Sequence, residues 1–362
     1  MKLRVFRLLA IAGLVSRFLD SVQTLAQNAY ITNDGSGDVS VIDTATNTVT
    51  TTIPVGTAPF AVTVSPDGGT VYVANIDSDN VSAIAASTNK VIATITVGSA
   101  PEGVAVSPDG STVYVANQHS NNVSVIGTAT NEVTATIAVG ANPFGVAVTP
   151  DGGTVYVANA GFGANTVSAI ATATNRLTKT ITVGNEPGGV AVTPDGSKVY
   201  VANFLANNVS VIATATNKVT ATIAVGVNPF GLAVTPDSST VYVANAGFGA
   251  DTVSAIATAT NTVTATISVG SEPFGVAVTP DGCKVYVANG ASNDVSVIAT
   301  ATNTVTAAIT AGSGPVAFGV FIIRRALPGR KGSRTVTARA ARRWPGGLAG
   351  SMPRPQPWDC RA

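Results

Sequence analysis

Residues 145–175 read GVAVTPDGGTVYVANAGFGANTVSAIATATN, and RLTKTITVGNEP follows at residues 176–187. The stretch contains four short runs rich in Val, Ile, Thr and Tyr, which are separated by Pro-Asp-Gly, a glycine-rich loop and Thr-Ala-Thr-Asn. Runs of this length and composition, bounded by such turns, are typical of antiparallel strands. We therefore predict that this unit folds as a four-stranded antiparallel meander.

The unit recurs along the chain, and its period can be counted from the tyrosines. Each of the seven tyrosines opens a copy of Tyr-Val-Ala-Asn, or of Tyr-Ile-Thr-Asn in the first copy: Tyr30, Tyr72, Tyr114, Tyr156, Tyr200, Tyr242 and Tyr286. The spacing is 42 residues, and it is 44 after Tyr156 and Tyr242, where the loops AGFGANT and AGFGADT are longer. Four strands in such a period predict a β-propeller. The expected fold class is all-β, a propeller of seven four-stranded blades.

The two ends of the repeat array predict how the ring closes. The first copy begins at Asn28 with its second strand, so it has no innermost strand of its own. After the seventh copy, residues 316–321 (VAFGVF) read as an innermost strand with no blade to follow. Since an unpaired sheet edge is unfavourable, we expect residues 316–321 to complete the first blade.

The segments outside the repeats divide the chain into three parts. In residues 1–26, basic residues precede the apolar run LLAIAGLV, and Thr-Leu-Ala ends the segment, as in a secretory signal. The run is too short for a membrane anchor, and export to the periplasm or cell surface is expected. Residues 27–321 form the predicted propeller. Residues 322–362 have no strand alternation, and two interpretations stay open: a disordered basic arm, or out-of-frame translation, which the abrupt change of composition favours.

Charge and cysteine content exclude some functions. Residues 323–362 hold ten of the twenty Lys and Arg, and residues 1–20 hold four more. Between residues 21 and 322 six basic residues face seventeen acidic ones, so the body carries a charge of about −11 and nucleic acid is not an expected partner. The two cysteines, Cys283 and Cys360, form no framework and are expected to be free thiols.

The repeated motifs resemble the YVTN family of β-propeller repeats. The resemblance rests on the Tyr-Val-Ala-Asn strands, the Ser/Thr-Pro-Asp-Gly turn, the Thr-Ala-Thr-Asn turn and the Val-Gly-x-x-Pro link, and covers about residues 28–321. It implies a surface-layer or periplasmic protein, similar in architecture to lactonase-type propellers and to the propeller domain of nitrous-oxide reductase. Proteins of such different functions share this fold, so the resemblance does not identify an activity.

Most residues that recur in every copy are expected to have structural roles. The Asp of each Pro-Asp-Gly or Pro-Asp-Ser turn is expected to cap its own backbone. The Asn that ends each Tyr-Val-Ala-Asn strand is expected to bond to backbone. The tyrosine rings are expected to pack between blades, each with a partner for its hydroxyl.

Propeller topology places the loops between second and third strands on the same face as the links between blades. These loops vary most among the copies, so this face is the expected binding surface. The candidate binding residues are Phe60, Glu102, His119, Phe144, Phe162, Glu186, Phe204, Phe230, Phe248, Glu272 and Phe274. The alternative for the phenylalanines is that they fill gaps between blades.

Catalytic and metal centres have little support in the sequence. His119 is the only histidine, so a multi-histidine copper or zinc centre, including the copper cluster of nitrous-oxide reductase, cannot be built. Residues 77–80 and the pair Asp34 and Asp38 offer oxygens for Ca²⁺, but not a full ligand set. There is no Gly-x-Ser-x-Gly motif, and the innermost strands contribute only Gly, Ala and Val to the channel. No cofactor, metal site or catalytic residue is predicted.

The function that these observations favour is an exported, non-catalytic binding or surface-display module, with a protein, peptide or glycan partner at the variable loops. A lactonase-like hydrolase with its site at the central mouth is the alternative. A purely structural envelope protein is a third possibility.

Overall fold

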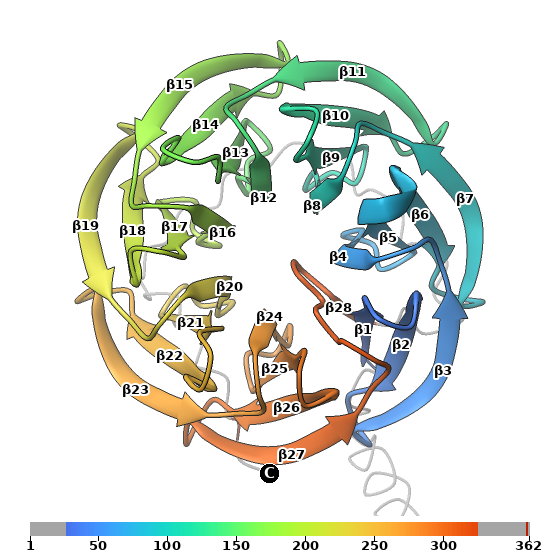
Figure 1. The fold of residues 1–362 in the computed structure, drawn as a ribbon, viewed down its shortest axis with the longest axis vertical. Helices are drawn as coiled ribbons and strands as arrows, with labels where there is room; N and C mark the ends of the chain where they lie inside the picture. Colours follow the sequence, from blue (N-terminus) through green and yellow to red (C-terminus); the bar gives the residue numbers. More distant parts are fainter. Residues whose placement is uncertain (1–26, 325–359, 361–362) are drawn as a thin grey trace, which may run out of the picture.

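The structure is a computed structural model that describes residues 27–324 and residue 360. It contains seven four-stranded antiparallel sheets, which stand around a common axis as the blades of a closed ring (Figure 1). Blade 1 has the strand order β28-β1-β2-β3, and blades 2 to 7 each use four consecutive strands from β4 to β27. The predicted fold class, a propeller of seven four-stranded blades, is confirmed.

Each blade has one strand in each of four positions from the axis outward. The innermost strands are β4 (Pro59–Val64), β8 (Pro101–Val106), β12 (Pro143–Val148), β16 (Pro187–Val192), β20 (Pro229–Val234), β24 (Pro273–Val278) and β28 (Ile322–Arg324). The second strands are β1 (Gln27–Asn33), β5 (Thr70–Asn75), β9 (Thr112–Asn117), β13 (Thr154–Asn159), β17 (Lys198–Asn203), β21 (Thr240–Asn245) and β25 (Lys284–Asn289).

The two outer positions complete the blades. The third strands are β2 (Asp38–Asp43), β6 (Asn80–Ala85), β10 (Asn122–Gly127), β14 (Thr166–Ala171), β18 (Asn208–Ala213), β22 (Thr252–Ala257) and β26 (Asp294–Ala299). The outermost strands are β3 (Thr48–Pro54), β7 (Lys90–Thr96), β11 (Glu132–Ala138), β15 (Arg176–Thr182), β19 (Lys218–Ala224), β23 (Thr262–Ser268) and β27 (Thr304–Thr310). A single 3-10 turn, η1 (Ile76–Ser78), lies between β5 and β6 in the described residues.

The hydrophobic core lies between the blades. The second and third strands are buried on both faces, whereas the outermost strands bury one residue each, an Ile such as Ile181 in β15. Val123 of blade 3 and Val155 of blade 4 belong to the same core cluster, as do equivalent residues of the next pair of blades. Burial on both faces explains why the strands are rich in Val and Ala on both sides.

The tyrosines join neighbouring blades, as predicted. Tyr156 is 1% exposed, and its hydroxyl donates to Oδ1 of Asn217 in the Thr-Ala-Thr-Asn turn of blade 5, at 2.6 Å. Equivalent bonds join Tyr30 to Asn89, Tyr200 to Asn261, Tyr242 to Asn303 and Tyr286 to Asn47. The turn Asn therefore has two roles, because Asn217 also has a positive φ of 52° that Asn tolerates well.

The second repeated Asn has different partners from those predicted. Asn75 at the end of β5 donates from Nδ2 to Asn80 Oδ1 at 2.8 Å and to Ser82 Oγ at 3.0 Å, both on the adjacent strand β6. It therefore bonds to side chains and not to backbone. The neighbouring strand already uses the backbone groups of β5 in the ladder, which leaves side chains as partners.

The ring is closed by the C-terminal part of the chain, but the closing strand lies later than residues 316–321. β28 pairs with β1 in the register Gln27 to Arg324, and Tyr30 N donates to Phe321 O at 2.8 Å. The segment before β28 leaves β1 and bends toward the axis, where Val62 N donates to Phe318 O at 2.8 Å. Residues 316–321 bond to β1 at both ends, since Val316 N also donates to Thr32 O at 2.9 Å, and between these ends they bulge toward the innermost strand of blade 2. The predicted closure of the first blade is therefore found, and the regular pairing falls on Ile322–Arg324.

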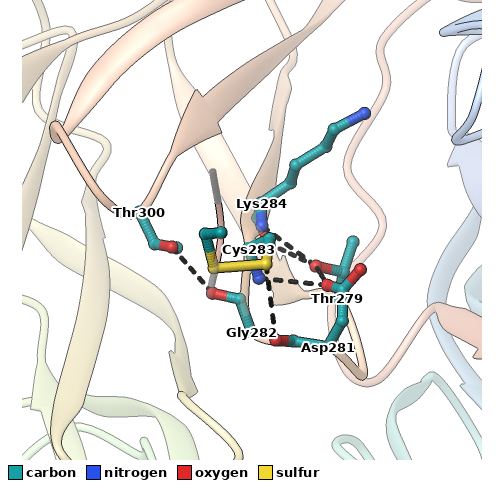
Figure 2. Close-up of a disulfide and its surroundings, with 7 residues drawn as sticks. Thr279, Asp281, Gly282, Cys283, Lys284 and Thr300 are labelled. Atoms are coloured by element: carbon teal, nitrogen blue, oxygen red, sulfur yellow. Dashed lines mark hydrogen bonds between the residues drawn. A yellow bond between two sulfur atoms is a disulfide. The ribbon is translucent and has the colours of Figure 1, made fainter. Parts of the chain in front are cut away.

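The prediction of two free thiols is wrong. Cys283 and Cys360 form a disulfide with a Cα–Cα distance of 5.4 Å and a sequence separation of 77 residues. Figure 2 shows this bond beside the turn of blade 7, where Cys283 N donates to the Asp281 carboxylate at 3.0 Å and Thr300 Oγ1 donates to Gly282 O at 2.7 Å. The sequence could not reveal the pairing, because one cysteine lies in a repeat and the other far beyond the array.

The predicted signal segment, residues 1–26, and residues 325–359 of the predicted tail lie outside the described residues. Within the described part of the chain, no helix has the length and apolar character to cross a membrane.

Candidate functional site

Five phenylalanines meet on the axis, at the end of the channel where the variable loops lie. Each of the first four follows the proline that begins an innermost strand: Phe60, Phe144, Phe230 and Phe274. The fifth, Phe318, comes from the closing segment. We call these five the phenylalanine plug. The structure thus brings the four candidate residues of this set together. Phe318 was not named as a candidate from the sequence, although its segment VAFGVF resembles the sequences of the innermost strands.

The rings of the plug pack mostly edge to face. The centroids of Phe144 and Phe230 are 5.2 Å apart, and those of Phe230 and Phe274 are 5.5 Å apart. Phe60 reaches Phe230 across the axis at 6.2 Å, and Phe318 lies 5.4–5.9 Å from Phe60, Phe144 and Phe230. Aromatic pairs at such distances stabilise one another beyond simple burial. The plug therefore fills the centre of the ring, and not gaps between blades.

Phe204, a candidate residue from the variable loop of blade 5, extends the plug outward. Its ring centroid lies 5.9 Å from that of Phe230. In contrast, Phe162 and Phe248 contact no other ring of residues 27–324 and are 103% and 99% exposed. The candidate phenylalanines thus form two groups, one buried or half-buried at the axis and one fully exposed on the loops.

Glu102 occupies the position that Phe takes in four other blades, directly after Pro101 at the start of β8. It is only 8% exposed. Burial raises the pKa of its carboxyl to about 7, and the carboxylate of Asp34 adds to the rise. Glu102 is therefore an acid that titrates near neutral pH at the rim of an aromatic cluster.

Beyond the plug, the channel forms an apolar cavity of about 260 Å³. Its wall is made of the second halves of the innermost strands, with residues such as Val106, Val148, Val192 and Val234. Val320 of the closing segment also lines it and is 64% exposed, so the cavity is open to solvent on the side of the Pro-Asp-Gly turns. None of the described lining residues is charged.

The turns around that open end are structural, as predicted. In each, the Asp carboxylate accepts a bond from the Ser or Thr before the Pro and from a backbone N–H two residues on, as with Asp151 and Gly153 N at 2.9 Å. These bonds lower the pKa of Asp67, Asp109, Asp151, Asp195 and Asp237, that of Asp109 to about 2. The carboxylates are thus occupied by their own turns.

The variable-loop face is acidic. Within residues 27–324, no Lys or Arg lies in or beside its loops and links, whereas nine carboxylates do: Asp34, Asp38, Asp77, Asp79, Glu102, Glu186, Asp251, Glu272 and Asp294. The six basic residues between β1 and β28 lie on outermost strands or beside the Pro-Asp-Gly turns. His119, a candidate residue, is exposed on this face in the loop after β9.

The acidic residues do not form a metal centre in the described residues. No three His, Cys, Asp or Glu residues there are grouped closely enough to hold a metal ion. Glu186 and Glu272, two further candidates, are half-buried in links that follow blades 4 and 6. Both have a positive φ, of 50° and 54°, at a link position where other blades have Asn, Ala or Gly.

Many solved structures resemble the chain, and three of them show the degree of likeness. Kuenenia stuttgartiensis hydrazine synthase is 24% identical, with a TM-score of 0.66 over 75% of this chain and 97% of that one. A protein of unknown function from Desulfotomaculum acetoxidans is 18% identical, with a TM-score of 0.70 over 81% and 99%. A candidate 6-phosphogluconolactonase from Bacteroides uniformis is 17% identical, with a TM-score of 0.70 over 83% and 99%. At these identities the likeness shows the fold alone.

No curated protein matches the chain. A family model described as the cytochrome D1 heme domain matches residues 25–321, which is the whole repeat array. On this match, the chain belongs to the cytochrome D1 heme domain family.

Proposed function

We propose that the chain is an exported, non-catalytic propeller of the YVTN type that binds a protein, peptide or glycan partner with its variable-loop face. The observation that carries the proposal is the contrast between the two ends of the channel. The variable-loop face presents fully exposed Phe162 and Phe248 among loops that differ from blade to blade. Among the described residues, the opposite end presents an apolar cavity, turns whose carboxylates are already bonded, and Lys198 and Lys284, whose ammonium groups donate to backbone carbonyls.

The disulfide supports export. Disulfides persist in oxidising compartments such as the periplasm and the extracellular space, and are rare in the cytosol. The bond between Cys283 and Cys360 is therefore in keeping with the secretory signal predicted for residues 1–26.

The family name raises the question of haem, and the described residues do not fit that group. Haem iron is held in proteins by His, Cys, Met or Tyr side chains. None of the described residues that line the cavity belongs to these types, and His119 lies exposed on a loop. The other end of the channel is filled by the phenylalanine plug. Haem is therefore assigned no role in this chain.

The alternative function, a lactonase-like hydrolase, has less support. Glu102 is the buried acid at the position that Phe takes in the plug, and the loops and links of this face contain no Lys or Arg to bind a phosphosugar. The test is a lactone hydrolysis assay on the purified protein. Turnover that is lost in Glu102→Gln would overturn the binding proposal in favour of the hydrolase.

The binding proposal is tested by loop replacement. In one chimera, all variable loops receive the four-residue loop of blade 7, residues 290–293, and the strands stay unchanged. Wild type and chimera are immobilised and incubated with the exported fraction, and cross-linked partners are identified by mass spectrometry. Partners captured by wild type should be absent from the chimera. Equal capture by both would refute binding through this face.

A further inference from the structure

We propose that blades 4 to 6 form a docking surface for a polypeptide that presents apolar side chains flanked by Lys or Arg. We call this surface the docking arc and define it by Phe162, Glu186, Leu205, Val227, Phe248 and Glu272. The inference rests on the proposed function. It specifies the partner as a basic polypeptide with apolar side chains, and the binding surface as the part of the variable-loop face on blades 4 to 6.

The apolar side chains of the arc are unusual in their position. Large hydrophobic residues exposed elsewhere in the described chain lie on the outermost strands, except Val320 in the cavity. The remaining four all belong to the arc: Phe162 at 103%, Leu205 at 48%, Val227 at 51% and Phe248 at 99% exposed. Clustered exposed apolar groups, unlike single ones, mark interaction sites.

Hydrogen bonds connect the loops and links of the arc into a continuous frame. Phe204 N donates to Glu186 O at 2.9 Å, and Phe204 O accepts from Asn228 Nδ2 at 3.2 Å. Gly247 N then donates to Val227 O at 3.0 Å, directly before Phe248. The apolar side chains therefore project from a backbone that is already ordered, which lowers the entropy lost on binding.

The acidic residues of the arc flank these apolar groups. Glu186 and Glu272 have positive φ values of 50° and 54°, a conformation that favours Gly or Asn over Glu. The equivalent links of four other blades have a φ of 49–53° with Ala58, Ala100, Asn142 or Asn228, so the link sets this conformation and the two Glu differ from these residues by their charge. Both links also lie beside a loop of the arc, since Glu272 N donates to Asp251 Oδ1 at 3.2 Å and Glu186 N donates to Asn165 Oδ1 at 3.3 Å.

Charge selects a basic polypeptide over other partners. The whole face has nine carboxylates and no Lys or Arg among the described residues, so it repels anionic lipid surfaces and nucleic acid. A partner with Lys or Arg around apolar side chains would satisfy both features of the arc.

The test uses a short fluorescent peptide of alternating Lys and Leu as the probe, with a peptide of alternating Glu and Leu as its counterpart. Binding is measured by fluorescence anisotropy at two salt concentrations. The first variant is Phe162→Ser with Phe248→Ser, whose side chains are fully exposed, so the fold is expected to persist. The second is Glu186→Gln with Glu272→Gln. The matched controls are Ile92→Ser, which is 58% exposed on β7, and Glu132→Gln on β11.

We expect the Lys-Leu peptide to bind wild type and both controls alike, and the double Phe variant at least about tenfold more weakly. The double Glu variant should bind more weakly and lose part of the salt dependence. Unchanged affinity in the double Phe variant would refute the docking arc. If the Glu-Leu peptide binds as tightly as the Lys-Leu peptide, a basic partner is refuted. If neither peptide binds but neutral phosphatidylcholine vesicles bind in a manner that depends on the two Phe, a polypeptide partner is refuted.

The same variants separate this inference from the proposed function. Capture from the exported fraction that is lost in the loop chimera but kept in the double Phe variant would refute the arc and leave the variable-loop face as the binding surface. Capture that is kept in both would refute both.

Discussion

Replacing Glu102 by Gln should make the stability of the propeller less dependent on pH. The folded state raises the pKa of Glu102 from 4.5 to about 7, mainly because the carboxyl is buried beside the plug. A raised pKa means that the protonated form is favoured in the fold. Its contribution to stability is therefore fully present below pH 4.5 and is lost as the pH rises through 7. Gln has a similar shape and cannot ionise.

The expected magnitude follows from the two pKa values. Each tenfold change in proton affinity is worth about 1.4 kcal/mol, so the step from 4.5 to about 7 corresponds to about 3 kcal/mol. Above pH 8 the Gln variant should be more stable than wild type by up to this amount. Below pH 4.5 the two should be equally stable.

The assay is urea unfolding of both proteins from pH 4 to pH 9, and the quantity compared is the difference in unfolding free energy. The lowered pKa values of the turn aspartates act in the acid range and are common to both proteins, so they cancel in the difference. Glu132→Gln, at an exposed position on β11, is the control for the loss of a surface carboxyl. A difference for Glu102→Gln that does not change with pH would refute the reasoning.

Three further predictions concern how the ring is held together. Replacing Cys283 by Ser opens a covalent loop of 77 residues and should lower the unfolding free energy by up to about 4 kcal/mol. A denaturant titration measures this loss, and reduction of the wild-type disulfide should have the same effect. An unaffected variant would show that the bond does not stabilise the ring. Ending the chain after Gly312 removes the closing segment and should lower the melting temperature far more than ending the chain after Arg324. Circular dichroism measures both melting temperatures. Equal decreases in the two truncated proteins would argue against closure by this segment. Replacing Tyr156 by Phe should cost about 1 kcal/mol in unfolding free energy, because the bond to Asn217 is lost, and no change would mean that this bond contributes nothing.

The sequence alone determined the blade and the number of blades. A strand of five or six residues, a Pro-Asp-Gly turn and an interblade Tyr are local features, and each is repeated with a period that can be counted. The roles of Asp151 and Tyr156 followed from the same local chemistry, since an Asp caps its own turn and a large ring must be buried with a partner for its hydroxyl. The need to pair the edge of β1 also predicted closure by the end of the chain.

The tertiary structure alone decided what meets at the centre and what is left exposed. Phe60 and Phe230 lie on blades that are distant in the chain, and only the closed ring brings them to 6.2 Å across the axis. The same closure buries Glu102 and raises its pKa, whereas Phe162, with the same apolar side chain as Phe60, remains in solvent on its loop. The bond between Cys283 and Cys360 likewise joins positions that no repeat relates. Burial and pairing of this kind depend on where residues distant in the sequence lie around the axis. A local sequence pattern does not contain these positions.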